Sequence, residues 1–354
     1  MLFFHALIAL LLATLTLSCP PPYNDMRFIG NTTHTSYDLI QAVHLNPDFG
    51  WNELVIPTGA VNQGELWPCG DSGVAVVSMC FRDAKADAEL ADFVFDSVNM
   101  WLDKLNFPSS DRGHAVKFRV HIKPDGSGPE MCYDETGHWN PINDSNAVII
   151  RSDRGLPYKA AATVGYRKTD ARRHHNEMYL NPEKLEEGDK VTVAHEWGHV
   201  LGLSHEHRRD DRDDWLDYKC ENVVGYEEAR RRVEDAGVHG IDEVCESAEL
   251  WYRLGFVGYA FTKNLWGNDE KAEKVTRKGP FDGNSIMLYH SYQGVGKDKD
   301  YNKYTDVPLV KWRNPGHKTH PKGRTADNCF KYRPLEDVSD GDFDAIKDLY
   351  PWTG

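Results

Sequence analysis

The sequence is short of positive charge and of long apolar runs. Against 55 Asp and Glu residues stand 41 Lys and Arg residues, for a formal net charge of −14. Because nucleic acids are bound chiefly through Lys and Arg contacts to phosphates, this balance disfavours a nucleic-acid partner. No internal repeat is seen, and beyond residue 18 no apolar run is long enough to span a bilayer, so stable membrane association is not expected. The 40% share of hydrophobic residues is sufficient for a globular core.

The first 18 residues contain no Lys, Arg, Asp or Glu and are almost entirely apolar. Such a run, ending in the small residues Thr16 and Ser18, is typical of a secretory signal peptide. It lacks the usual preceding positive residues, so a membrane signal-anchor is the alternative. We expect a signal peptide at 1–18 and a secreted, extracellular protein. The sequons at Asn31 and Asn143 lie in turn-rich surroundings, which suits glycosylation at the surface.

Seven cysteines agree with an oxidising compartment, where six would pair. Loss of an N-terminal pro-segment that carries Cys19 would leave an even set, whose connectivity the sequence leaves open. The preferred pair is Cys220–Cys245, because both lie in one polar insert at about 214–280. The others are Cys69, Cys80, Cys132 and Cys329.

Residues 19–65 are rich in Pro, Asn, Gly and Thr and show little periodicity, which predicts a pro-segment or N-terminal extension. The ordered domain is expected over 66–354. Its first helix should be capped by Asp83 and present one apolar face to a sheet. That face comprises Leu90, Val94, Val98, Trp101, Leu102 and Leu105.

Periodicity predicts an α+β fold with a further helix from about 190 to 201. Gly202 can adopt the left-handed conformation that ends a helix, and Ser339 is placed to cap a short closing helix. The predicted strands are 74–81, 116–122, 147–151, 163–167 and 177–180.

Three histidines after residue 194 have the spacing of metal ligands. Positions four apart share a helix face, so His195 and His199 can direct imidazole nitrogens at one ion. Gly202 then lets the chain turn, which brings His205 round as a third ligand. Three protein ligands leave one position open, as in catalytic zinc sites, whereas structural sites are closed by four. The sequence predicts one catalytic Zn²⁺ on these histidines.

Glu196 lies beside the predicted ligands and is the candidate general base. Bound zinc lowers the pKa of its water to about 7, so a neighbouring carboxylate can accept the proton and pass it to the leaving amine. The ion also polarises the scissile carbonyl. We therefore expect a zinc-dependent endopeptidase with protein or peptide substrates. The alternative, an amphipathic helix with surface histidines, does not account for Gly202 and His205.

Beyond the third histidine the sequence resembles the astacin family of metzincin zinc metallopeptidases. That family has a His-Glu-His-x-Arg-x-Asp-Arg-Asp pattern here, and 284–289 resembles its Met-turn. The resemblance implies a mixed twisted sheet with two long helices in an upper half, a mostly irregular lower half, and substrate extended between them along an edge strand, expected at 177–180. The matching residues are His205, Glu206, His207, Arg209, Asp211, Arg212 and Asp213.

The resemblance also implies roles that spacing alone does not give. Tyr289 matches a tyrosine that ligates zinc at rest and swings to stabilise the oxyanion, for which a phenol is suited. Met287 matches the residue that forms the apolar floor under the metal. Glu206 matches a glutamate that pairs with the new N-terminus after activation.

Some residues depart from the family pattern. Leu288 stands where many members have histidine, the chain between His205 and Met287 is longer than typical, and the usual C-terminal cysteine is missing. Residues 28–31 resemble the family's pro-segment motif, in which an aspartate plugs the zinc, but Asn31 replaces that acid. Chance similarity is the preferred explanation, and inhibition by that route is not expected. These departures bear on disulfides, specificity and latency, and leave the metal ligands in place.

Other polar residues are interpreted as solvated. His174 and His175 are expected to be exposed rather than ligands, and the arginines at 208–209 and 230–232 are expected in solvated salt bridges. Two alternatives to an astacin-like peptidase remain: another metzincin subfamily, and a secreted zinc-binding protein of this fold without turnover. Nothing in the sequence indicates the oligomeric state.

Overall fold

The computed structural model describes residues 26–29, 32–35, 66–156, 158–166, 176–236, 240, 245, 257–263, 279–316, 323–333 and 336–353. The predicted signal peptide, Asn31, His174 and His175 lie outside these residues. Ahead of residue 66 the described part is a hairpin of β1 (Met26–Ile29) and β2 (Thr32–Thr35). Among the described helices, none combines the length and apolar character that a bilayer crossing needs.

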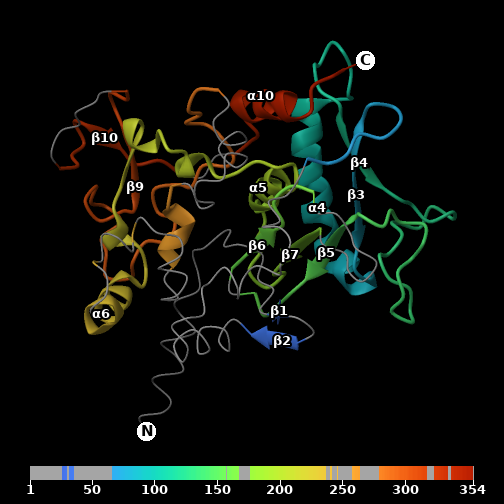
Figure 1. Cartoon of the computed structure of the whole chain (residues 1–354), viewed down its shortest axis with the longest axis horizontal. Coiled ribbons are helices and arrows are strands. Elements are labelled where there is room, and N and C mark those ends of the chain that lie inside the picture. The colour runs from blue at the N-terminus through green and yellow to red at the C-terminus, as the bar shows by residue number, and fades with distance from the viewer. Residues whose placement is uncertain are drawn as a thin grey trace, which may run out of the picture.

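A mixed sheet of five strands forms one side of the molecule, in the order β4-β3-β5-β7-β6. All neighbours are parallel except β6, which pairs antiparallel with β7. Figure 1 shows this sheet beside the helices α4 and α5. The strands are β3 (Ala75–Phe81), β4 (Val116–Val120), β5 (Val148–Ser152), β6 (Ala160–Ala162) and β7 (Glu177–Leu180).

The sheet corrects two predictions. The strand predicted at 163–167 is wrong, because β6 comes earlier, at Ala160–Ala162. The strand predicted at 177–180 is confirmed as β7, but its predicted edge position is wrong, since β7 is paired on both sides and β6 is the outer strand. Three consecutive buried alanines show no alternation, and strand order depends on pairing between distant segments, so neither feature was visible in the periodicity.

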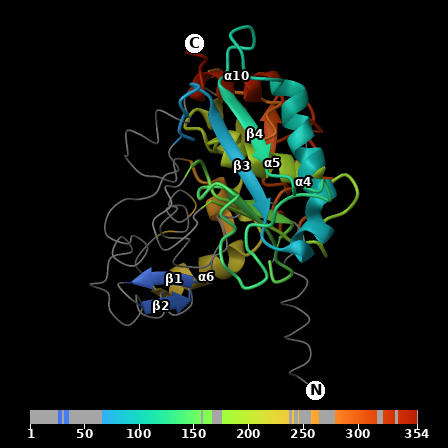
Figure 2. The same cartoon turned by 90° about the vertical axis from the view of Figure 1, so that its right-hand side faces the viewer.

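The two long helices pack together behind the sheet. In α4 (Ala84–Leu105) the Asp83 side chain accepts a hydrogen bond from the Ala86 N–H at 2.9 Å, which confirms the predicted cap. Trp101 Nε1 donates to the carbonyl of Ala194 in α5 (Lys190–Val200) at 2.8 Å. Leu102 was wrongly assigned to the buried face; it is 37% exposed, because it lies one helical step away from Trp101. Figure 2 shows β3 and β4 side by side with α4 alongside them.

The second half has little regular structure in its described part, as predicted, but contains a small antiparallel sheet in the order β10-β9-β8. Figure 1 places this sheet and α6 across the molecule from β3 and β4, with α5 between. The remaining elements are β8 (Leu216–Tyr218), β9 (Leu309–Trp312), β10 (Cys329–Phe330), α6 (Tyr226–Ala236), α10 (Asp340–Leu349), and the short 3₁₀ helices η1 (Glu206–Arg208), η2 (Arg212–Asp214), η3 (Cys220–Asn222) and η4 (Val257–Phe261).

Two disulfides join parts of the fold. Cys220–Cys245 confirms the preferred pair, and Cys80–Cys132 ties the end of β3 to the loop that follows β4. In the described part of the chain Cys69 and Cys329 are free, so the expectation that six cysteines pair is wrong for these two: Cys69 lies beside Ala75 at the start of the five-stranded sheet, whereas Cys329 lies in β10 of the other sheet. The polar insert is therefore cross-linked.

Asn143 corrects the expectation of a surface sequon. Its side chain is 4% exposed, and Nδ2 donates to the Met131 carbonyl at 2.8 Å. The turn that carries it folds back against the preceding loop, a contact that composition does not predict. A glycan on this nitrogen would need space that the buried side chain does not have.

Candidate metal centre

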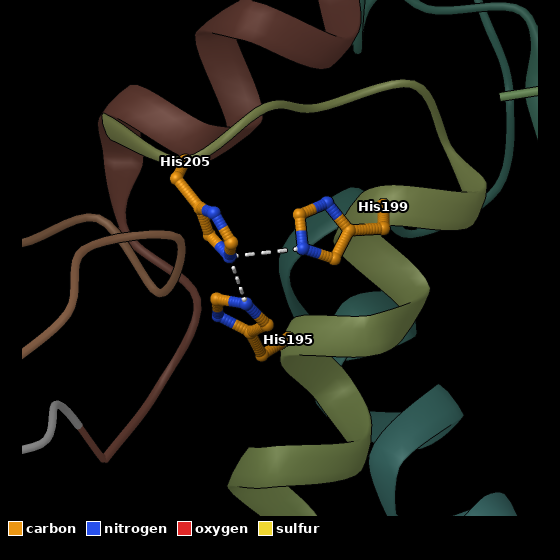
Figure 3. Close-up of side chains that lie close together, drawn as sticks. All are labelled: His195, His199 and His205. Carbon is orange, nitrogen blue, oxygen red and sulfur yellow. Dashed lines mark hydrogen bonds between the residues drawn. The ribbon is translucent and has the colours of Figure 1, made fainter. Parts of the chain in front are cut away.

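Helix α5 and the turn after it bring the three predicted histidines to one point. His195 and His199 lie one turn apart on α5, and Gly202 adopts φ 100°, a conformation strained for residues with a Cβ. The chain then returns so that His205 Nε2 lies 3.1 Å from the Nε2 atoms of both His195 and His199. Figure 3 shows the three rings directed at one another from the helix and the loop.

The outer nitrogens of the helical pair are held by carbonyl groups. His195 Nδ1 lies 2.7 Å from the Ile286 oxygen, and His199 Nδ1 lies 2.9 Å from the Leu203 oxygen. Because a carbonyl only accepts, each Nδ1 carries the proton and each neutral ring directs an Nε2 lone pair at the common point. Converging lone pairs repel unless a cation lies between them.

The spacing suits zinc. At a Zn–N distance of 2.0–2.1 Å, tetrahedral ligands have nitrogens about 3.3 Å apart, close to the separations of 3.1 Å here. The three residues are only 4–7% exposed, and burial lowers the pKa of His195 to about 4 and those of His199 and His205 well below 6.5. Neutral imidazoles are the form that binds metal, so the residues fit the predicted ion.

Met287 forms the floor beneath α5. A Cβ at Gly198 would clash with the Met287 sulfur and approach its methyl group, so any larger residue at this point requires the Met287 side chain to move. Met287 is 1% exposed, and its carbonyl accepts from the Glu206 N–H at 3.1 Å. The need for glycine at 198 was missed, because it arises from a residue 89 positions away in the sequence.

Asp342, which no sequence motif marked as a site residue, attaches this floor to α10. Its carboxylate accepts from Ser285 Oγ at 2.6 Å, from the Ile286 N–H at 2.8 Å and from the Ser339 N–H at 2.9 Å. The last of these completes the capping box of the helix. The sequence signal for the capping box was present, but the bonds to Ser285 and Ile286 require the fold.

The other predicted site residues lie around the triad. Glu196 is fully buried on α5, and Tyr289 is 2% exposed with its ring centroid 4.5 Å from that of His205. Glu206 Oε1 accepts from the Asp282 N–H at 2.7 Å, and burial raises the pKa of Glu206 to about 7 despite the nearby Arg209.

The charged run after the triad is partly buried rather than solvated. Arg209 is 7% exposed, pairs through two nitrogens with Asp211 at 2.8 Å and donates to the Gly279 carbonyl. Arg212 bonds Asp213 and the Phe261 carbonyl. The expectation of a solvated salt bridge is therefore wrong at Arg209, because the Arg209 and Arg212 side chains hold their loop against distant segments of the chain. The expectation is confirmed for Arg230, which pairs with Glu227 and Glu234 on the surface of α6.

Comparisons with known proteins agree with the site. Residues 152–240 match the family model described as Astacin, a peptidase family. Astacin-like metalloprotease toxin 1 of Loxosceles intermedia is 29% identical over 136 residues, 38% of this chain and 37% of that protein. Astacin-like metalloprotease toxin 5 of Loxosceles gaucho is 31% identical over 104 residues, 29% of this chain and 37% of that protein. The chain thus spans little more than a third of the length of these relatives.

Among solved structures, High choriolytic enzyme 1, a hatching enzyme zinc-protease from Oryzias latipes, is similar with a TM-score of 0.42 and 14% identity over 83% of this chain and 97% of that one. The segment that matches the family model contains the three histidines, Glu196 and Glu206, and ends before the predicted Met-turn.

Proposed function

We propose that this chain, whose resemblance to the astacin family is confirmed over residues 152–240, is a secreted zinc endopeptidase that hydrolyses peptide bonds of proteins. The observation that carries the proposal is the convergence of three imidazole Nε2 atoms, with separations of 3.1 Å from His205 to each of the other two. One zinc ion held there supplies Lewis acidity, which activates water and polarises the scissile carbonyl.

The residues around the triad take separate roles. Glu196, next to His195 on α5, accepts the proton of the attacking water and delivers it to the leaving amine. Tyr289, packed against His205, donates a hydrogen bond to the oxyanion as it forms. Glu196 is buried, so its carboxylate is shielded from bulk water.

The proposed domain boundaries place a signal peptide at 1–18, a pro-segment at 19–65 and the catalytic domain at 66–354. Support for a domain start near 66 comes from Trp67, which is 1% exposed. Its Nε1 donates to the Val200 carbonyl at 2.7 Å, and its backbone N–H donates to the Tyr350 hydroxyl at 3.3 Å. This residue therefore joins the start of the domain to the end of α5 and to the C-terminal segment.

The test is cleavage of denatured casein by the secreted, processed protein, with mass spectrometry to locate its N-terminus. We expect cleavage that a chelator stops and zinc restores. Glu196→Gln keeps the shape of the side chain without its basicity, so it should lower kcat by at least about 10³-fold while metal analysis still finds one bound zinc.

The matched control is Glu206→Gln, which also removes the charge of a glutamate near the triad, here a partly buried one, but leaves the general base in place. It should retain far more activity than Glu196→Gln. Stoichiometric zinc in a correctly processed protein that cleaves nothing would overturn the proposal and favour a zinc-binding protein without turnover.

A further inference from the structure

His207 lies two residues after the third histidine and is completely buried. Its ring stacks on Tyr289, with centroids 4.2 Å apart and an interplanar angle of 28°. It also stacks on His205 at 5.0 Å and 27°. One imidazole that is not part of the triad therefore contacts both a proposed zinc ligand and the proposed oxyanion donor.

Hydrogen bonds at two edges determine the orientation of the His207 ring. Nε2 lies 2.8 Å from the Ala260 carbonyl oxygen, and Nδ1 lies 3.3 Å from the backbone nitrogen of Tyr289. The carbonyl requires a proton on Nε2, which leaves the Nδ1 lone pair to accept from the Tyr289 N–H. Both bonds are satisfied by one neutral tautomer, so the ring connects η4 to the backbone at Tyr289.

The third histidine differs from the other two in how its ring is held. His195 and His199 each direct Nδ1 at a carbonyl oxygen, whereas His205 Nδ1 has no hydrogen-bond partner within the described residues. Ligand histidines usually depend on such a bond for their ring orientation. The His205 ring is instead in contact with two other rings: His207 stacks on it, and Tyr289 packs against it with its ring tilted by 54°.

We propose that His207 is a positioning residue, which orients the ring of His205 for the metal and places the backbone of Tyr289 for its action on the oxyanion. This inference rests on the proposed function, but its metal part is independent of turnover. His207 touches neither the ion nor the substrate, so its effect passes through these two neighbours.

The test compares His207→Phe, which keeps an aromatic ring but removes both hydrogen bonds, with His207→Asn, whose amide oxygen can replace Nδ1 as the acceptor for Tyr289. We expect His207→Phe to lower kcat by about 10- to 100-fold with a much smaller change in KM, and His207→Asn to recover part of the loss. In a Tyr289→Phe background the same His207→Phe change should lower kcat by less, because the part of its effect that passes through the phenol is already lost.

A second measurement does not need activity. The protein loaded with cobalt(II) should show a changed visible spectrum and roughly tenfold weaker metal binding in His207→Phe, because the His205 ring is less restrained. The matched control is His114→Phe: His114 is also fully buried, with Nε2 2.9 Å from the Leu105 carbonyl and Nδ1 accepting from Val116 N–H, but its ring packs on Phe343. It should unfold more easily without altering the cobalt spectrum.

An unchanged cobalt spectrum and affinity, together with equal kcat losses in the presence and absence of the Tyr289 hydroxyl, would overturn the inference. If the wild-type protein binds cobalt but cleaves no substrate, the proposed function alone is contradicted. The comparison of the cobalt spectra of the variants would then still decide the role of His207.

Discussion

Gly198 and the residues that share its helix turn show how little space the metal centre leaves. The site needs a helix between His195 and His199, yet a side chain at the intervening Gly198 would meet the sulfur of Met287. Glycine in a helix costs about 1 kcal/mol relative to alanine, so its presence here is explained by packing rather than by helix propensity. Because residue 198 has no Cβ, the Met287 side chain can pack directly against α5 between the two helical ligands.

We therefore expect Gly198→Ala to destabilise the fold by about 1–3 kcal/mol, despite the better helix propensity of alanine, and to weaken metal binding. Urea unfolding and chelator competition measure the two effects. Combining it with Met287→Ala, which removes the clashing sulfur, should give less than the sum of the two single losses. Additive losses would mean that the sulfur is not what excludes a side chain at position 198.

At the scale of elements, α10 acts as a support for the metal floor although it contributes no ligand. Asp342 in its first turn accepts hydrogen bonds from Ser285 and from the Ile286 N–H, and the Ile286 carbonyl in turn meets His195 Nδ1. Helix α10 is thereby linked through a single residue, Ile286, to the first ligand on α5.

Asp342→Asn should lower stability by about 2–4 kcal/mol, because one carboxylate oxygen becomes an amide that cannot accept from buried donors. It should also weaken zinc binding. The control is Asp340→Asn in the same turn, where the acid is exposed and pairs with Lys104; there the change in unfolding free energy should stay within about 0.5 kcal/mol. Similar losses in both variants would indicate an effect of helix charge alone.

The junction of α4 and β4 predicts a dependence of stability on pH. Burial and, secondarily, Arg112 lower the pKa of His114 in the folded protein from the ordinary 6.5. Below 6.5 the unfolded chain therefore binds more protons, so this stability is complete above pH 6.5 and is lost as the pH falls toward the folded pKa.

Urea unfolding at a series of pH values from about 8 down to about 5 should show a smaller loss of stability in His114→Gln than in the wild-type protein. The other histidines are present in both proteins, so the difference between the curves reports His114. Parallel curves would show that its pKa is not perturbed.

For the whole molecule, a metal on the triad would link its two halves, since α5 packs on the sheet side while the Met-turn and η1 adjoin the second half. Zinc binds the folded arrangement, so a free concentration about 1,000 times its Kd stabilises the fold by about 4 kcal/mol. Removing zinc with a chelator should lower Tm by several degrees in calorimetry. His199→Ala, which lacks a ligand, should show little change on chelation; an equal shift would indicate stabilisation at another site.

The sequence by itself determined what depends on short separations along the chain. The i, i+4 spacing of His195 and His199, the turn at Gly202, and the caps at Asp83 and Ser339 follow from local geometry, and the structure reproduces their elements. Resemblance added Met287 and Tyr289, which the structure places beside the triad, although their chemical roles stay predictions.

Only the tertiary structure decided which strand lies outermost, that Asn143 is buried, that Asp342 supports the Met-turn, and that His207 stacks on both His205 and Tyr289. The physical reason is the same for each. These features are contacts between segments far apart in sequence, and burial or stacking of that kind leaves no periodic pattern in either partner.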